Sequence, residues 1–358
     1  DEEQKMLIDA ISRYARTDMR ETAHDADEAR EIPKAVIEKG WELGFLQASV
    51  PEDYGGFGEH SAVTGVLAAE ELAWGDLSGA MTVMTPALFS LPVLIAGSEE
   101  QKKKYLPKVI EAEWQPYSAA LVEKAYDFDP NDLKTSAVVD GDEYLISGEK
   151  VFVPFADKAK AMIVYANLEG KTQGFIIHSG SAGLTIGERE KHLGWQAIPL
   201  FTVRFDGVRV PKEDRLGGPD GHAFEPILTA LQLASASMAV GVSRAALEYS
   251  RDYAKEREAF GVKIAQKQAI AFMLAEMATE IEAIRLLTWE AAWMADQGMD
   301  EAAKSAYLAQ AGAMDMAMMV TDRAVQILGG HGYIREHPVE LWMRNARGFA
   351  AFTGLAMV

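Results

Sequence analysis

Apolar positions follow a helical period over roughly the first third of the chain. Met6 and Ile11 begin the pattern, and a second amphipathic run occupies residues 32–43. Apolar residues three and four positions apart share one face of a helix, so both runs predict helices packed on a common core. Turn signals such as Gly55 separate the segments. The pattern therefore predicts an all-helical domain over residues 1–116.

The period of the apolar positions changes to two in the middle of the chain. Segments of alternating β-branched, aromatic and polar residues lie at residues 136–139, 143–146, 161–165, 174–178 and 201–205. Asp140-Gly141 is typical of a hairpin, because a type I′ turn needs positive φ at both central positions. Strands do not alternate with helices, which excludes a doubly wound sheet. We predict a compact antiparallel β-domain over residues 117–216.

The helical period returns at about Phe224 and continues to the end of the chain. Its longest seam repeats apolar residues at alternating steps of four and three, at Ile270, Leu274, Met277, Ile281 and Ile284. Such a seam is typical of helices packed antiparallel in a bundle. We predict a C-terminal four-helix bundle over residues 217–358, which makes the whole fold α+β with three domains.

Composition and charge narrow the possible functions. The 358 residues are 49% hydrophobic, as in a globular protein, and the net charge of −19 argues against nucleic acids and anionic membrane surfaces as partners. The absence of cysteine excludes disulfides and thiolate chemistry and fits a cytoplasmic location. No apolar run reaches the roughly 18 to 20 residues of a membrane span, and the histidines show no metal-binding spacing. We expect neither a membrane span nor a metal site.

Several short strings resemble motifs of the acyl-CoA dehydrogenase family, in the order and spacing of that family. They lie at residues 40–44, 51–56, 99–107, 141–150, 208–211, 257–261, 268–270 and 326–333. The resemblance covers nearly the whole chain. It implies an FAD enzyme that oxidises an acyl-CoA between Cα and Cβ: a carboxylate removes the α-proton while flavin takes a hydride from Cβ. It also implies an electron-transfer flavoprotein as the electron acceptor.

The carboxylate base is missing at both positions where the family places it. The resemblance aligns Thr353 with the commonest glutamate, and Leu231 with the glutamate that a minority of members carry on an earlier helix. A threonine hydroxyl is not a base near neutral pH without help, and leucine has no acid–base chemistry. No catalytic residue is therefore assigned in this chain.

The contacts that a family member makes to its own flavin are also altered. The family's Thr-Glu-Pro string and the small residues after it correspond to residues 122–129, which include the bulky Tyr126 and Phe128. The family's Trp-x-Thr, which backs the isoalloxazine and donates toward N5, corresponds to Phe152-Val153-Pro154. Proline supplies neither a hydroxyl nor an N–H, so a flavin held by this chain would lose hydrogen bonds and meet new bulk.

Another set of cofactor residues remains. The resemblance assigns contacts to the pyrophosphate and adenine end of FAD to Arg257, Phe260, Gln268, Gln326, Gly329 and Gly330. In the family these groups reach across a subunit interface to the FAD of a neighbouring subunit. An arginine can pair with a phosphate through two hydrogen bonds, and glycines let backbone approach a ligand closely. The alternative is that Arg257 is a surface ion-pair residue and that Gly329 and Gly330 simply end a helix.

Three hypotheses remain open. The first is the base-less subunit of a heterotetrameric acyl-CoA dehydrogenase, which completes the FAD site of a homologous partner that carries the base and the acyl-CoA; the chain alone need not be an active enzyme. The second is a self-sufficient acyl-CoA flavoenzyme with altered chemistry, or with Glu123 or Asp127 as its acid. The third is a non-catalytic scaffold that binds acyl-CoA.

Overall fold

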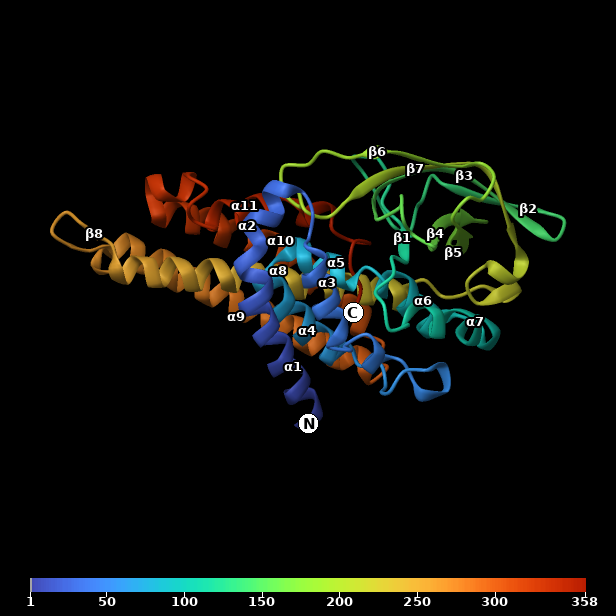
Figure 1. Cartoon of the computed structure of the whole chain (residues 1–358), viewed down its shortest axis with the longest axis horizontal. Helices are drawn as coiled ribbons and strands as arrows, with labels where there is room; N and C mark the ends of the chain where they lie inside the picture. The colour runs from blue at the N-terminus through green and yellow to red at the C-terminus, as the bar shows by residue number, and fades with distance from the viewer. Residues whose placement is uncertain (1) are drawn as a thin grey trace.

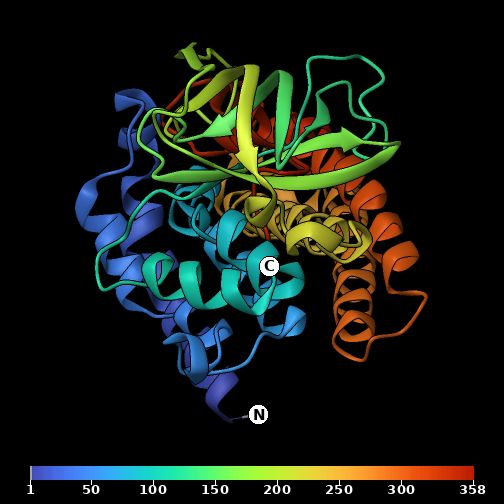
Figure 2. The ribbon, with the colours of Figure 1, turned by 90° about the vertical axis from the view of Figure 1, so that its right-hand side faces the viewer.

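The helices and the sheet form two layers. The computed structural model describes residues 2–358, apart from the side chain of Glu3. The N-terminal helices and the C-terminal bundle lie side by side, and the β-sheet covers both of them on one side (Figures 1 and 2). The three parts follow one another as helical, β and helical, so the prediction of an α+β fold is confirmed.

Residues 2–109 form only helices and the turns between them, as the apolar period predicted. They are α1 (Glu2–Tyr14), the π-helix η1 (Ala15–Met19), α2 (Arg20–Ala29), α3 (Lys34–Glu42), the 3₁₀ turns η2 (Gln47–Ser49) and η3 (Glu52–Tyr54), α4 (Ala62–Gly75), α5 (Leu77–Met84), α6 (Ala87–Ala96) and α7 (Glu99–Val109). Polar caps fix several helix ends. Ser98 and Gln101 form a capping box at the start of α7, and Asp76 separates α4 from α5.

Asp76 is a buried cap whose charge opposes folding. Its Oδ2 accepts a 2.7 Å hydrogen bond from the N–H of Gly79, yet burial raises its pKa to about 6. Because the folded-state pKa lies above the unfolded value, the stability from this group is present at low pH and lost as the pH rises through about 6.

We therefore expect Asp76→Asn to stabilise the protein at pH 8 by on the order of 3 kcal/mol, since asparagine keeps the cap without the charge. The gain should shrink as the pH falls toward 4. Urea unfolding at several pH values measures it, and a variant no more stable than wild type at pH 8 would contradict the argument.

The middle part is one seven-stranded sheet. Its strands are β1 (Ser118–Ala120), β2 (Ser136–Asp140), β3 (Glu143–Pro154), β4 (Ala161–Leu168), β5 (Lys171–His178), β6 (Leu184–Arg189) and β7 (Leu200–Pro211). The order is β1-β4-β2-β3-β7-β6, and β5 also pairs with β4. The pairs β2–β3, β3–β7, β4–β5 and β6–β7 are antiparallel, whereas β1 and β2 each run parallel to β4. The prediction of an antiparallel domain holds for the four antiparallel pairs but not for β1–β4 and β2–β4, because no hairpin links either β1 or β2 to β4 and long connections allow parallel pairing.

The predicted β2–β3 hairpin is present, with its turn one residue later than expected. Asp140 pairs with Glu143, so Gly141 and Asp142 are the two central residues. Only Gly141 has positive φ, at 63°. A glycine with positive φ at the first central position is typical of a type II′ turn, which twists the strands as a type I′ turn does.

The C-terminal part contains three long helices and a short fourth. The elements from β7 onward are η4 (Lys212–Asp214), η5 (Gly218–Asp220), α8 (Glu225–Glu256), the small hairpin β8 (Glu258–Ala259) and β9 (Val262–Lys263), η6 (Ile264–Gln266), α9 (Gln268–Asp296), α10 (Ala302–Leu328), η7 (Gly329–Tyr333), α11 (Val339–Ala346) and η8 (Arg347–Ala351). The predicted seam lies on α9, where Met277 and Ile281 are fully buried. The domain limits predicted at 116/117 and 216/217 fall in the irregular segments before β1 and before α8.

Helix α8 joins the two helical parts. It packs against α9 and α10 of its own bundle and against α4 of the N-terminal part. A buried ion network reinforces this contact: Glu70 of α4 pairs with Arg244 of α8 and, at 3.0 Å, with Arg285 of α9. Among the described residues, α8 alone is a single helix long and apolar enough to span a membrane, but 89% of its apolar window is buried in the fold. That burial is what the core helix of a bundle shows.

Candidate functional site

Neither position where a base was sought carries an ionisable group. Thr353 follows η8, and its Oγ1 accepts a short hydrogen bond from the side-chain amide of Gln310 on α10. Leu231 is buried in α8, only 2% exposed. The segment after Thr353 is packed into the same apolar core, where Leu355, Ala356, Met357 and Val358 are all buried. These positions therefore provide apolar packing and a neutral amide–hydroxyl contact.

Glu123, which the second hypothesis offered as an acid, is a fully engaged structural carboxylate. Its Oε1 accepts from the buried Nζ of Lys150 at 2.8 Å and from the N–H of Thr135 at 2.8 Å, and its Oε2 accepts from the N–H of Lys134 at 2.7 Å. Burial raises its pKa, but Lys150 and these donors hold the pKa below its usual value. A carboxylate with a lowered pKa is a weak base. Asp127, the other candidate, lies on the surface.

The strand that should back a flavin ring faces other aromatic side chains. Phe152 of β3 has φ of 57°, and its ring lies 5.2 Å from that of His192 and 6.5 Å from that of Trp195. Trp195 in turn contacts Phe352 edge-on, with ring centroids 5.8 Å apart. Trp195 therefore lies between the strand at Phe152 and the segment that leads to Thr353.

The cavity left beside this aromatic cluster is small. It has a volume of about 200 Å³ and includes Phe152, His192 and Trp195 in its lining. Pockets for drug-sized ligands and cofactors measure roughly 300 to 1,000 Å³, and FAD is larger than most drugs. Together with Pro154, which has no N–H to donate, the residues present at this position do not fit a flavin.

The six predicted cofactor residues come from elements at the end of the bundle where α8 and α10 end and α9 begins. They come from the end of α8 and the β8–β9 hairpin (Arg257, Phe260), the start of α9 (Gln268), the end of α10 (Gln326) and η7 (Gly329, Gly330). The hairpin projects from the molecule at this end (Figure 1). Two contacts link these elements. The hydroxyl oxygen of Tyr253 on α8 lies 2.7 Å from Nδ1 of His331 in η7, and Arg323 of α10 forms an ion pair with Glu276 of α9.

All six of these residues are exposed. Some of them have a side-chain environment or a backbone conformation that is unusual for a surface residue. Phe260 is 94% exposed and has φ of 55°. Arg257 makes no ion pair with any residue in the described range 2–358. Gly329 has φ of 59°, and a Cβ added to it or to Gly330 would meet no atom within 4 Å. The surface-ion-pair alternative for Arg257 therefore finds no partner, whereas Gly329 does end α10 as its alternative proposed.

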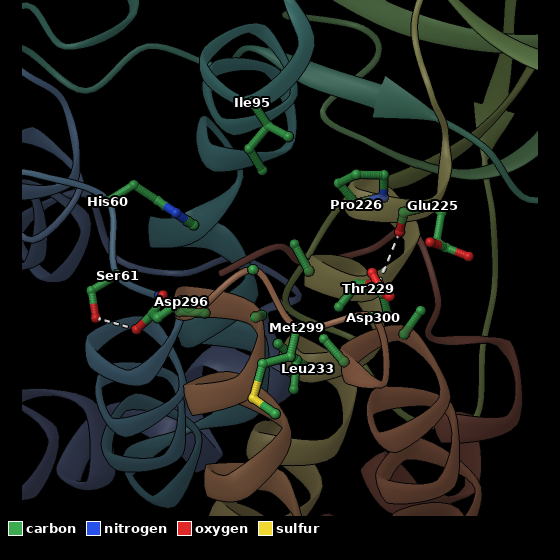
Figure 3. Close-up of a pocket in the computed structure, with 16 residues that line it drawn as sticks. His60, Ser61, Ile95, Glu225, Pro226, Thr229, Leu233, Asp296, Met299 and Asp300 are labelled. Atoms are coloured by element: carbon green, nitrogen blue, oxygen red, sulfur yellow. Dashed lines mark hydrogen bonds between the residues drawn. The ribbon is translucent and has the colours of Figure 1, made fainter.

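Two larger cavities lie away from the six predicted cofactor residues. One, of about 640 Å³, is bounded by Ile95, Met299 and the start of α8 (Figure 3). It opens on the face of α8 that carries Thr229 and Leu233, and Leu231 lies about 200° around the helix from each. The other, of about 1010 Å³, separates α3 from the sheet and has a lining of mixed charge. Neither contains a predicted cofactor residue.

Sequence reasoning missed Trp195 and the ion pair between Lys150 and Glu123. The one local signal at Trp195 is the glycine before it, Gly194, which is too common to predict a packed ring. Among the described residues, no group of three histidine, aspartate or glutamate side chains is arranged to hold a metal ion.

Comparisons with known proteins agree along the whole chain. Sequence profiles of the acyl-CoA dehydrogenase N-terminal, middle and C-terminal domains match residues 1–113, 118–208 and 224–356. The mitochondrial short-chain specific acyl-CoA dehydrogenase of Sus scrofa is 33% identical over 364 residues, covering 99% of this chain and 87% of that protein. A subunit of the caffeyl-CoA reductase-Etf complex of Acetobacterium woodii is 34% identical, with coverage of 100% and 96%. The structure of butyryl-CoA dehydrogenase from Megasphaera elsdenii superimposes with a TM-score of 0.88 at 31% identity, covering 98% of this chain and 94% of that one.

Proposed function

The chain belongs to the acyl-CoA dehydrogenase family of flavin-dependent oxidoreductases, and we propose that it is the base-less subunit of a heteromeric member of that family. In this proposal it completes the FAD site of a homologous subunit, which carries the base and binds the acyl-CoA. FAD, when bound in that subunit, accepts the hydride that leaves the substrate. A heterotetramer is the expected assembly, and a cytoplasmic location remains our expectation.

One observation carries the proposal: the residues for a flavin in this chain are lost, while those assigned to a neighbour's flavin are exposed. Thr353 and Leu231 provide no base, and Trp195 fills the space beside Phe152. At the other end of the bundle, Arg257 has its guanidinium free of ion pairs within the described part of the chain. There it can bind phosphate, while Gly329 lets backbone come close to the ligand.

The electron acceptor is proposed on the same basis. One relative belongs to a complex named for Etf, the electron-transfer flavoprotein. One similar structure, at 33% identity and a TM-score of 0.89, is named for the electron transferring flavoprotein of Acidaminococcus fermentans. These names support an electron-transfer flavoprotein as the partner that reoxidises the complex.

The alternatives receive less support. A self-sufficient enzyme that uses Glu123 must first break the pair with Lys150 and two backbone hydrogen bonds. A non-catalytic scaffold gives no reason for an exposed Arg257 that has no ion pair within residues 2–358.

Measuring which subunit binds the flavin tests the proposal directly. We expect the purified chain alone to be colourless and inactive toward acyl-CoA. Co-expression with a homologous subunit encoded beside it should give a yellow complex that oxidises acyl-CoA and contains about one FAD per partner subunit. Absorbance in the flavin bands and turnover with a dye acceptor measure both properties. The proposal fails if the chain alone holds stoichiometric FAD and turns over.

A further inference from the structure

Trp195 is buried and has a backbone conformation that is rare for a residue other than glycine. Its φ is 55°, a region that residues with a Cβ rarely occupy, and its side chain is only 4% exposed. Asn345 at the end of α11 holds it twice. The backbone N–H of Trp195 donates to Oδ1 of Asn345 at 2.8 Å, and its indole Nε1 donates to the backbone oxygen of Asn345 at 3.0 Å. The main chain and the ring are therefore fixed by the same residue, about 150 positions away in the sequence.

Two glycines make room for this ring. A Cβ added to Gly348 would lie 1.8 Å from Cζ2 of Trp195, so no other residue fits at position 348 while the indole stays in place. A Cβ added to Gly194 would lie 2.3 Å from the backbone oxygen of Arg344, so the loop also needs glycine to press against the end of α11. The ring and the surfaces around it are thus complementary in shape, which indicates that the indole is a closely packed part of the core.

The indole lies between Phe152 of the sheet and Phe352 after η8, which is where the family resemblance would place a flavin ring. It touches Phe152 on the sheet side and Phe352 on the side of η8, and the cavity that remains is about 200 Å³. We infer that Trp195 excludes a flavin ring from this chain's own cavity by filling the space itself. This inference rests on the proposed function for its role in the complex, where it ensures that each pair of subunits holds its FAD on one side only.

The test uses lumiflavin, which is the flavin ring without the ribityl and nucleotide parts, and the full chain in the absence of any partner. Equilibrium dialysis should detect no saturable lumiflavin binding to wild type. Trp195→Gly, which also relieves the positive φ, should bind lumiflavin at least about ten times more tightly, and free indole should compete with it for the same space. Trp289→Ala is the matched control. It removes a half-buried tryptophan on α9, away from this cavity, and should gain no binding.

Trp195→Leu provides a second variant, because it keeps an apolar side chain in the core if the glycine variant does not fold. It should show a smaller gain in lumiflavin binding. Circular dichroism and gel filtration establish which variants are folded. Folded Trp195 variants that bind lumiflavin no better than wild type, or a wild type that already binds it as tightly as Trp195→Gly, would overturn the inference. Failure of the chain to form a flavin-containing complex with a partner would overturn the proposed function and leave this result unaffected.

Discussion

Replacing Arg257 with alanine is expected to weaken FAD binding by the assembled complex roughly 10- to 100-fold. A charge-assisted hydrogen bond to a phosphate contributes about 1.5 to 3 kcal/mol, and each 1.4 kcal/mol corresponds to a factor of ten. Arg257 is exposed and has no ion pair within the described chain, so its loss costs the fold little. FAD affinity is measured by titrating the deflavinated complex.

Arg251→Ala is the control, because Arg251 lies in the last turns of α8, the helix that Arg257 follows directly, and its one ion pair within residues 2–358 is with its neighbour Asp252. It should leave FAD affinity unchanged. Thr353→Ala should leave turnover of the complex unchanged, because this chain supplies no base. Equal effects of Arg257→Ala and Arg251→Ala would show that only general charge matters and would contradict the assignment of Arg257.

Replacing Glu123 with glutamine is expected to lower the free energy of unfolding by about 3 to 5 kcal/mol. The variant leaves the ammonium group of Lys150 buried without a counter-charge, and breaking a buried pair from one side costs this much. Lys150 has no exposed side-chain surface, so water cannot take the place of the carboxylate. The Lys134 and Thr135 N–H groups donate to different oxygens of the carboxylate, and in glutamine one of these two atoms becomes an NH2 group, which cannot accept. Urea unfolding followed by circular dichroism measures the change.

Glu149→Gln serves as the control for this experiment. Glu149 precedes Lys150 on β3 and pairs with Arg204, but both side chains are partly or largely exposed. Exposed pairs contribute about 0 to 1 kcal/mol, so this variant should be nearly as stable as wild type. A loss of less than about 1 kcal/mol in Glu123→Gln would show that the buried pair does not stabilise the fold.

The sequence was a reliable guide wherever local periodicity decides the structure. The seam from Ile270 to Ile284 predicted a long helix, and α9 forms there because successive apolar residues fall on one face. The β2–β3 hairpin was also predicted, since a two-residue turn with Gly141 is a local property. The parallel pairs of β1 and β2 with β4 were not predicted, because pairing between distant segments depends on the whole sheet.

Some features of the candidate site are also predictable from the sequence, and others are not. The missing base and the residues assigned to a neighbour's FAD are predictions that the family resemblance makes from the sequence. The position of the Trp195 ring could not be predicted, because it depends on Asn345 and Gly348, which are distant in the sequence and only become neighbours on folding. The structural role of Glu123 was not predicted, because its ion pair joins the segment after β1 to Lys150 in the middle of β3 and leaves no local pattern.

The ion network around Glu70 affects how cooperatively this protein unfolds. Glu70 belongs to the N-terminal helices, while Arg244 and Arg285 belong to the last third of the chain. Separating the two helical parts would break these ion pairs and expose the apolar contact between α4 and α8 to water, so neither part is expected to persist as a native subdomain after the other has melted. The two helical domains of the sequence thus form one cooperative unit, and sheet residues such as Ile163 and Tyr165 share its hydrophobic core. A truncation that removes either helical part should leave the other without a stable core.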